Sequence, residues 1–445
     1  MRMQLCVLAL ACAATFAQAK NSDTSELGKT LTPMGSEQAA NADGSIPAWT
    51  GGLPKSAGNV DASGSYQDPF ASEQPLFTVT ARNLEQYKAF LSPGQVALFK
   101  RYPDSYTMPV YPTHRSANLP SEVLEQSRAN VGKVTLADGG NGMHDYQRGI
   151  PFPLPTEGIE VMWNHMTRWR GGSYERIASS ALVRENGTVS YIRGQSLINF
   201  AESIQDLEPG ANVLFMFKNR VLEPARLSGE AVLVHDPIDQ VAEPRAAWQY
   251  IPGQRRVRRA PMIAYDNSAR YSNGLITSDN VDGYNGAPDR YDWKLIGKQE
   301  LFIPYNSYRL ADHKLKYADI IKPGHIDQGL TRYEKHRVWV VEATLKPGAR
   351  HIYAKRRFYV DEDSWQIAQV DQYDSRGELW RGVELHAMHQ YDHGFTYNVM
   401  EVSYDLISGR YYAGGLTNEE KEPMRVGFAA RKDEYTPSDL RRWAK

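Results

Sequence analysis

The chain has 445 residues, of which 41% are hydrophobic and 23% are charged, a composition typical of a globular protein rather than a disordered one. Its 51 basic and 52 acidic residues leave a formal net charge of −1, which excludes a strong overall attraction to nucleic acid. Beyond the N-terminal segment no apolar run is long enough to cross a bilayer, so a polytopic membrane protein is also excluded.

The first 19 residues have the pattern of a secretory signal peptide. Arg2 supplies a positive charge, an apolar run extends over residues 5–16, and residues 17–19 form a small-residue cleavage site. Both cysteines, Cys6 and Cys12, lie in this segment, so the mature chain is expected to contain no disulfide and no cysteine metal site. We therefore predict export to the periplasm, with lipidation of Cys12 as the alternative.

Two segments precede the predicted sheet. Residues 20–80 are rich in Gly, Pro, Ser, Asn and Asp, and we predict an irregular N-terminal arm that packs on the main body. Residues 81–172 carry helical signals, the clearest of which is a capping box formed by Ser92 and Gln95 around Pro93. A second set of apolar residues at helical spacing predicts an amphipathic helix; it consists of Ile159, Met162, Trp163 and Met166.

From residue 173 to residue 412 the pattern changes to strands joined by short turns. Asn186-Gly187 lies between two alternating runs and is the strongest hairpin signal, and residues 248–259 indicate a second hairpin. We predict an α+β protein, mainly β, with one large curved antiparallel sheet: an open half-barrel covered by helices on its concave side. Residues 413–445 are expected to form a C-terminal tail with a short helix.

A search for enzyme and metal-binding motifs is mostly negative and gives little support to a catalytic function. The chain contains no G-x-S-x-G, H-E-x-x-H or P-loop pattern. The segment from His386 to His393 is rich in metal-ligand types, but His386 and His389 should point to opposite faces of a strand. Residues 278–283 partly match a calcium loop, and we interpret them as an acidic surface loop. Residues 361–363 could supply acid or base carboxylates, and we interpret them as a polar hairpin tip between two strands. We predict no catalytic residue, no metal and no cofactor.

Aromatic residues make up 11% of the chain, and many fall on the predicted strands. A curved sheet with an aromatic face must cover that face with its own helices or leave a cavity for an apolar ligand. Ordinary core packing is the alternative for each of these residues. The predicted ligand-binding residues are Phe215, Phe217, Trp248, Tyr250, Val257 and Trp339.

The densest basic run consists of Arg255, Arg256, Arg258 and Arg259. On a strand, Arg255 and Arg259 share one face and Arg256 and Arg258 the other. A solvated hairpin is the simple interpretation, and contact with an anionic headgroup or an acidic partner is the functional one. Nucleic acid is not expected as a partner.

Several longer motifs are distinctive; they are residues 31–35, 41–52, 248–261, 291–294, 304–308 and 351–359. They resemble a secreted proteobacterial family, domain of unknown function 1329, over nearly the whole mature chain. This family is similar in fold to the outer-membrane lipoprotein-sorting carriers, which are open β half-barrels that hold acyl chains. The resemblance implies no catalytic residues, and it implies an association with export by resistance-nodulation-division transporters.

The expected function is that of a non-enzymatic carrier or accessory protein in the periplasm or at the outer membrane. It would shelter a lipid or another hydrophobic molecule beneath a helical lid and assist envelope transport. Its expected partners are that molecule and a resistance-nodulation-division exporter or an outer-membrane protein. Two alternatives stay open: a hydrolase acting on lipid or glycan through Asp or Glu residues, and a structural or interaction protein of the outer membrane.

Overall fold

The computed structural model describes residues 23–260, 265–422 and 424–445. The predicted signal peptide, residues 1–19 with Cys6 and Cys12, lies outside the described residues. Within the described ranges, no helix combines the length and the apolar character that a bilayer span requires.

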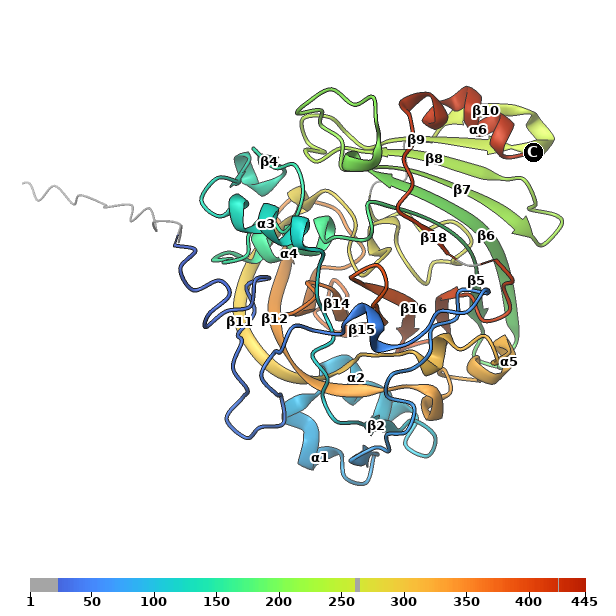
Figure 1. Ribbon diagram of the computed structural model, residues 1–445. Coiled ribbons are helices and arrows are strands. Elements are labelled where there is room, and N and C mark those ends of the chain that lie inside the picture. The colour runs from blue at the N-terminus through green and yellow to red at the C-terminus, as the bar shows by residue number, and fades with distance from the viewer. Residues whose placement is uncertain (1–22, 261–264, 423) are drawn as a thin grey trace, which may run out of the picture.

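One large sheet dominates the molecule (Figure 1). In this view it curves from β11 and β12 on the left, through β14–β16, to β5–β10 on the right and at the top. Its strand order is β1-β2-β12-β13-β14-β15-β16-β17-β5-β6-β7-β8-β9-β10, with β11 added beside β12 and β18 beside β5. Neighbours pair antiparallel except at the short parallel bridge between β2 and β12. No pairing among the described strands joins β10 to β11 or β1, so the sheet is not closed into a barrel.

The strands of this sheet are β1 (Phe77–Val79), β2 (Met108–Val110), β5 (Ser173–Val183), β6 (Val189–Phe200), β7 (Phe215–Glu223), β8 (Ala231–Asp236), β9 (Ala246–Ile251), β10 (Arg256–Arg259), β11 (Tyr291–Pro304), β12 (Tyr333–Leu345), β13 (Lys355–Asp361), β14 (Ile367–Tyr373), β15 (Leu379–Gln390), β16 (Phe395–Asp405), β17 (Tyr411–Leu416) and β18 (Arg425–Val426). A separate pair consists of β3 (Thr135–Leu136) and β4 (Met143–His144). The helices are α1 (Leu84–Tyr87), α2 (Pro93–Arg101), α3 (Ser121–Asn130), α4 (Gly158–Thr167), α5 (Tyr317–Ile320) and α6 (Pro437–Trp443).

The predicted fold class is confirmed: the protein is mainly β, with one large curved sheet and helices packed on it. The capping box of α2 is present, because the Ser92 side chain accepts from Gln95 and the Gln95 side chain accepts from Ser92. The Asn186-Gly187 turn joins β5 to β6. The helix predicted from Ile159, Met162, Trp163 and Met166 forms as α4, and these four residues pack in a buried core. The polar side of α4 is buried as well.

The helices lie on both faces of the sheet. On β15, Glu384 accepts a hydrogen bond from Gln95 of α2 at 3.1 Å. Its neighbours Val383 and Leu385 instead pack in the hydrophobic cluster that contains α4. Because successive side chains of a strand point to opposite faces, α2 and α4 cover opposite faces. The expectation that all helices up to residue 170 lie on the concave side was therefore wrong.

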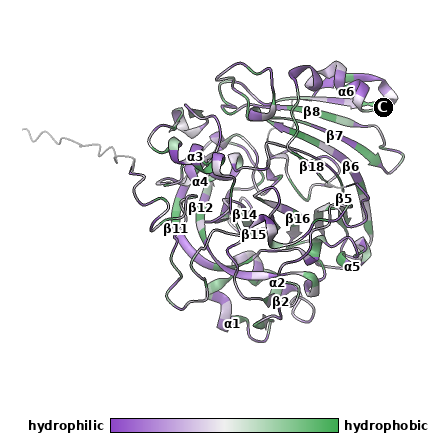
Figure 2. Ribbon diagram, in the orientation of Figure 1, coloured by the Kyte–Doolittle hydropathy of each residue, from purple (hydrophilic) through white to green (hydrophobic). Residues whose placement is uncertain are grey.

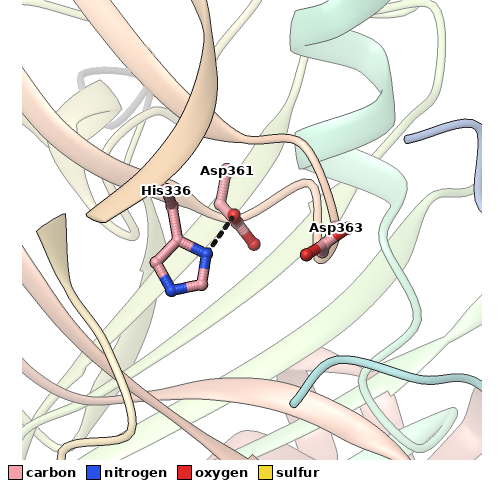
Figure 3. Close-up of side chains that lie close together, drawn as sticks. All are labelled: His336, Asp361 and Asp363. Carbon is pink, nitrogen blue, oxygen red and sulfur yellow. Dashed lines mark ion pairs between the residues drawn. The ribbon is translucent and has the colours of Figure 1, made fainter. Parts of the chain in front are cut away.

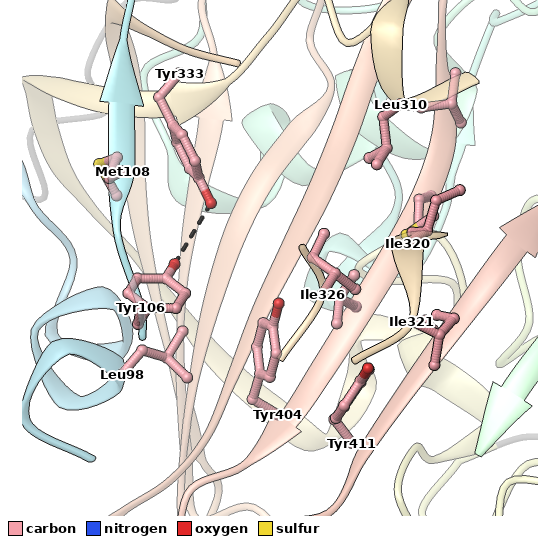
Figure 4. Packing of buried hydrophobic residues seen from close by; sticks show 14 of the residues in the cluster. Leu98, Tyr106, Met108, Leu310, Ile320, Ile321, Ile326, Tyr333, Tyr404 and Tyr411 are labelled. Atoms are coloured by element: carbon pink, nitrogen blue, oxygen red, sulfur yellow. Dashed lines mark hydrogen bonds between the residues drawn. The ribbon is translucent and has the colours of Figure 1, made fainter. Parts of the chain in front are cut away.

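The α2 face carries a large core (Figure 4). Leu98 of α2 packs there with Tyr404 and Tyr411 from the sheet. The hydroxyl groups of Tyr106 and Tyr333 lie 3.4 Å apart, and they approach the Glu384 carboxyl group at 3.3 and 3.0 Å. Burial raises the pKa of Glu384 to about 6. This face is closed by side chains of the chain itself.

Asp371 of β14 fixes the start of α2 against the sheet. Its Oδ1 atom accepts from the backbone N–H of Gly94 at 2.8 Å, and its Oδ2 atom accepts from the Tyr359 hydroxyl at 2.9 Å. Asp371→Ala should lower the free energy of unfolding by about 2–4 kcal/mol, because both buried donors lose their acceptor. Urea unfolding measures this change. Glu378→Ala, an exposed control, should cost less than about 0.5 kcal/mol, and equal losses in the two variants would contradict the assignment.

Candidate functional site

A cavity of about 560 Å³ lies on the α4 face of the sheet. Ser180, Glu401 and Tyr412 line it, whereas the adjacent residues Ala181 and Val402 pack in the core on the α2 face. The alternation of strand residues therefore separates a closed core on one face from an open space on the other. The volume is in the range of small-molecule binding sites.

The apolar wall of the cavity comes from β6, β7 and β8. It is formed by Ile192, Phe217, Val221, Val232 and Val234. The residues between them, such as Leu233, point to the opposite side and pack against α6. Figure 2 shows hydrophobic and hydrophilic residues interleaved along these strands.

A loop covers the cavity. Residues 265–282, here called the cover loop, contribute Asn267, Ala269, Tyr271, Ile276 and Val281 to the lining. No residue of the described α-helices lies on this wall. The structure thus places a loop, rather than the predicted helical lid, over the cavity.

The second half of the cover loop is held by buried ion pairs. Asp279 binds Arg356 at 2.6 Å and His351 at 3.2 Å. Asp282 binds Arg168 and Arg170 at 2.7 and 2.8 Å. The interpretation of residues 278–283 as a surface loop was wrong for Asp279 and Asn280, which are buried, whereas Val281 is exposed. Guanidinium groups compensate the buried Asp279 and the half-buried Asp282.

The first half of the cover loop reaches the sheet through fewer contacts. Arg270 forms an ion pair with Glu230, which directly precedes β8, and the Tyr271 hydroxyl also donates to Glu230. The Arg270 and Glu230 side chains are 27% and 18% exposed, so this contact is closer to solvent than the Asp279 pair. The second half of the cover loop is therefore held by several buried ion pairs, whereas the first half is held to the sheet mainly through Glu230.

The polar end of the cavity is built around Asp282. Arg168 donates to both Asp282 carboxylate oxygens at 2.7 Å, and Asn398 donates to one of them at 2.8 Å. Although burial opposes ionisation, the charges of Arg168 and Arg170 hold the pKa of Asp282 well below its ordinary value. This carboxylate is charged, and guanidinium and amide donors occupy its oxygens.

Glu401 has the opposite electrostatic character. Its carboxyl group accepts from the backbone N–H of Asp282 at 2.9 Å. Burial, followed by the negative charge of Asp282, raises the pKa of Glu401 to about 8. Glu401 is therefore mostly protonated and neutral at pH 7.

Arg176 lies on β5 at the same end of the cavity. Its guanidinium carbon is 5.2 Å from the centre of the Tyr397 ring. Its Nη1 atom is buried and has no hydrogen-bond partner, and within the described residues Arg176 forms no ion pair. A half-buried, unpaired guanidinium group thus faces a largely apolar space.

Of the six predicted ligand-binding residues, the structure places Phe217 on the cavity wall. Phe215 lies on the same strand and packs on Phe200, with 5.8 Å between the ring centres. Trp339 lies in the α4 core, 6.3 Å from the ring of Trp365. The remaining residues pack in the α6 cluster; they are Trp248, Tyr250 and Val257. A ligand-binding role for the six stays a prediction.

Strand parity explains where these side chains lie. Gln249, between Trp248 and Tyr250, lines the cavity, while the two aromatic residues point to α6. An aromatic stripe identifies a buried face but does not tell which of two buried faces contains a cavity. Sequence reasoning also missed Arg176, although its position among Tyr174, Ala178 and Ser180 in a period-two row marks one face of a strand.

Arg256, Arg258 and Arg259 of the predicted basic run lie on the edge strand β10, whereas Arg255 lies in the turn before it. The hairpin of residues 248–259 is confirmed. All four arginines are exposed, and none lines the cavity. Arg255 has a φ of 51°, and the Arg259 guanidinium carbon is 5.6 Å from the Trp248 ring. Their contact with a headgroup or a partner stays a prediction for Arg255, Arg256, Arg258 and Arg259.

Figure 3 shows a buried group with metal-ligand side chains: His336, Asp361 and Asp363. Their nearest ligand atoms lie within 4.8 Å of one another, and His336 Nδ1 is 3.8 Å from Asp361 Oδ1. Asp363, however, already binds the Arg115 guanidinium group through both oxygens, at 2.6 and 2.8 Å. Within the described chain the histidine-rich segment 386–393 forms no comparable group.

The acidic turn at residues 361–363 holds the N-terminal arm. The predicted hairpin tip joins β13 to β14, but all three of its carboxylate residues are only 1% exposed. Arg115 and Arg337 both form ion pairs with Glu362, and Arg115 also pairs with Asp363. Both guanidinium groups donate to the backbone carbonyl of Glu37 in the arm, at 2.7 and 3.1 Å. The network therefore ties the arm to the sheet.

The chain belongs to a family described as "Protein of unknown function (DUF1329)", whose model matches residues 78–441. The uncharacterized protein PA3922 of Pseudomonas aeruginosa is 54% identical over 439 residues, covering 98% of this chain and 96% of that protein. The family resemblance seen in the sequence is thus confirmed.

Two solved structures with a similar fold are a member of the same family and a lipoprotein-sorting protein domain. A DUF1329 family protein from Desulfovibrio piger has a TM-score of 0.43 and 14% identity, covering 61% of this chain and 92% of that chain. A putative outer membrane lipoprotein-sorting protein domain from Vibrio parahaemolyticus has a TM-score of 0.43 and 12% identity, covering 64% and 98%. Likenesses at this level support no conclusion about a ligand.

Glu401→Gln should flatten the pH dependence of stability between about pH 5 and 8. The native pKa of Glu401 is about 8, whereas an unfolded Glu has a pKa of about 4.3. The native state therefore keeps a proton that the unfolded chain has lost, and stability falls as the pH rises from about 5 to 8.

Urea unfolding at pH 6.5 and pH 8.0 measures this effect. The wild-type protein should lose on the order of 1 kcal/mol per pH unit more than Glu401→Gln over this interval. The exposed control Glu378→Gln should behave as the wild type does. Identical pH slopes in the wild type and Glu401→Gln would show that Glu401 is ionised in the native protein.

Proposed function

We propose that this protein is an exported, non-enzymatic carrier or accessory protein that holds a lipid or another hydrophobic molecule in the cavity beside β5–β8. The observation that carries this proposal is the cavity itself: about 560 Å³ with an apolar wall and a few polar groups at one end. Small-molecule sites have this combination, since apolar surface supplies affinity and polar groups fix orientation.

The energetics are sufficient for a carrier. Apolar surface leaving water gains about 25 cal/mol per Å². A ligand that buries about 400 Å² would gain on the order of 10 kcal/mol before the costs of association. Binding of this strength is compatible with capture and later release.

The proposed location rests on the N-terminal sequence pattern, and the proposed partners rest on the family resemblance. The N-terminal signal pattern supports export to the periplasm, where the protein would act alone or at the outer membrane. A resistance-nodulation-division exporter or an outer-membrane protein is the proposed partner. The exposed arginines of β10 offer an acidic partner a basic surface outside the cavity.

A hydrolase is the second candidate, because Asp282 and Glu401 share the cavity and have pKa values on opposite sides of neutrality. Against it, the Asp282 oxygens are occupied by Arg168, Arg170 and Asn398, which makes this carboxylate a poor base or nucleophile. Turnover of lipid esters or glycosides that disappears in Glu401→Gln would favour the hydrolase. The cavity itself counts against a structural protein with a solidly packed sheet interior.

The direct test is chemical identification of the bound molecule. Protein purified gently from the periplasm, extracted with organic solvent and examined by mass spectrometry should release an amphiphile in stoichiometric amount. Repeated empty preparations that also fail to take up a fluorescent fatty acid would contradict the carrier.

Ala178→Phe tests whether uptake uses this cavity. The added ring should fill space beside β5 and reduce fluorescent fatty acid binding at least about tenfold, since excluded ligand surface loses its burial energy. Ile177→Phe, one residue earlier on the same strand and on the opposite face, should bind as the wild type does. Equal binding by both variants would place the ligand elsewhere.

Glu230→Gln tests how the ligand enters. Loss of the Arg270 ion pair should free the first half of the cover loop and increase the dissociation rate of a fluorescent fatty acid several-fold, measured by stopped flow. Glu223→Gln, whose carboxylate is 67% exposed and pairs with Arg193 outside the cavity, is the control. An unchanged dissociation rate in Glu230→Gln would show that the ligand enters and leaves through another part of the cavity wall.

A further inference from the structure

The charges at the polar end of the cavity do not balance. Three guanidinium groups line this end, those of Arg168, Arg170 and Arg176. Asp282 is the charged carboxylate among them, and it is bound by Arg168 and Arg170. Near pH 7 Glu401 adds little negative charge, because its pKa is about 8. Among the described residues, Arg176 forms no ion pair with any carboxylate, and its Nη1 atom has no hydrogen-bond partner, so its charge has no bound counter-ion.

An unpaired, desolvated cation is costly in a protein. Arg176 has a buried Nη1 atom without a hydrogen-bond partner, and the ring of Tyr397 is its neighbour. Contact with an aromatic ring stabilises a cation less than an ion pair with an anion does. The site therefore has the charge and the free donor that an anionic group requires.

Strand register places further polar groups beside Arg176. Arg176 of β5 pairs with Ser196 of β6, and Ser196 pairs with Asn219 of β7. All three line the cavity, so they form one polar row across its floor. Ser196 Oγ accepts from the Asn219 amide at 3.0 Å, which leaves the serine O–H group able to donate to a ligand.

An apolar row lies directly beside this polar row. Ile198 of β6 pairs with Phe217 of β7, which pairs with Val234 of β8. Phe217 and Val234 line the cavity, one register step from Ser196 and Asn219. A molecule with a small polar head and an apolar chain matches these adjacent rows.

We propose that the bound molecule is an anionic amphiphile: its carboxylate or phosphate headgroup binds the Arg176 guanidinium group, and its alkyl chain packs on Phe217 and Val234. This inference rests on the proposed carrier function and names the chemical class of its ligand. Arg176 is the residue that distinguishes an anionic from a neutral ligand, and Ser196 adds a hydrogen bond to the same headgroup.

The test compares ligands that share one chain and differ in the headgroup. Dodecanoate, dodecyl phosphate and dodecanol are titrated into the full mature protein at pH 7, and inorganic phosphate is titrated separately. The wild type should bind both anionic ligands at least about tenfold more tightly than dodecanol, and it should show no saturable binding of inorganic phosphate.

Arg176→Gln should weaken binding of both anions about 10- to 100-fold and change dodecanol binding less than about threefold. Arg176→Lys should recover part of the preference. Arg184→Gln, which removes an exposed arginine just beyond the end of β5, is the matched control and should bind as the wild type does. Without ligand, Arg176→Gln should be at least as stable as the wild type, because it removes an unpaired charge; a purely structural arginine would give a loss.

Different outcomes overturn different claims. Equal affinity of the wild type for dodecanol and dodecanoate, or an unchanged preference in Arg176→Gln, would overturn the headgroup assignment and leave the carrier proposal standing. Inorganic phosphate binding as tightly as dodecyl phosphate would replace the amphiphile by a free anion. Failure of every alkyl ligand to bind would overturn both proposals.

Discussion

The ion group formed by Asp282, Arg168 and Arg170 is the constraint on which the cavity depends. It joins the end of the cover loop to the segment between α4 and β5. The α4 face of the sheet is therefore crossed here by a loop and not by a packed helix, which would leave less space. Breaking a buried pair of this kind by removing one partner costs about 3–5 kcal/mol. The loop therefore keeps its position while the space beneath it stays open.

Two faces of one sheet then serve two purposes. On the α2 face, Leu98, Tyr404 and their neighbours close the core and supply the hydrophobic stabilisation. On the α4 face, the same strands present Arg176, Phe217 and Val234 to a space that the protein does not fill. Because side chains alternate along each strand, the closed core fixes the register that aligns the polar and apolar rows of the cavity.

Much of the architecture could be predicted from the sequence. The capping box at Ser92, the Asn186-Gly187 hairpin and the succession of strands are local signals, and each forms as expected. The burial of Asp279 and of Asp363 could not be predicted in this way, since their compensating cations, Arg356 and Arg115, come from distant segments. In the sequence alone, these acidic segments have the composition of exposed turns.

The site was harder to predict than the fold, for a physical reason. The sequence pattern of a strand can show that both of its faces are buried. It cannot show which face contains a cavity, because a packed core and an apolar cavity are lined by the same residue types. Phe217 and Trp248 are equally plausible lining residues by sequence, and only the course of the cover loop and of α6 separates them. The charged residues of the cavity are the more specific signal, because a charge facing apolar space requires a partner.

The most direct test of ligand binding in the cavity is an experimental structure of the protein purified from its source cells without added ligand. Elongated density is expected in the cavity, with its head within hydrogen-bond distance of the Arg176 guanidinium group and its tail along Phe217 and Val234. A cavity filled by the protein's own side chains, or by ordered water alone, would contradict it.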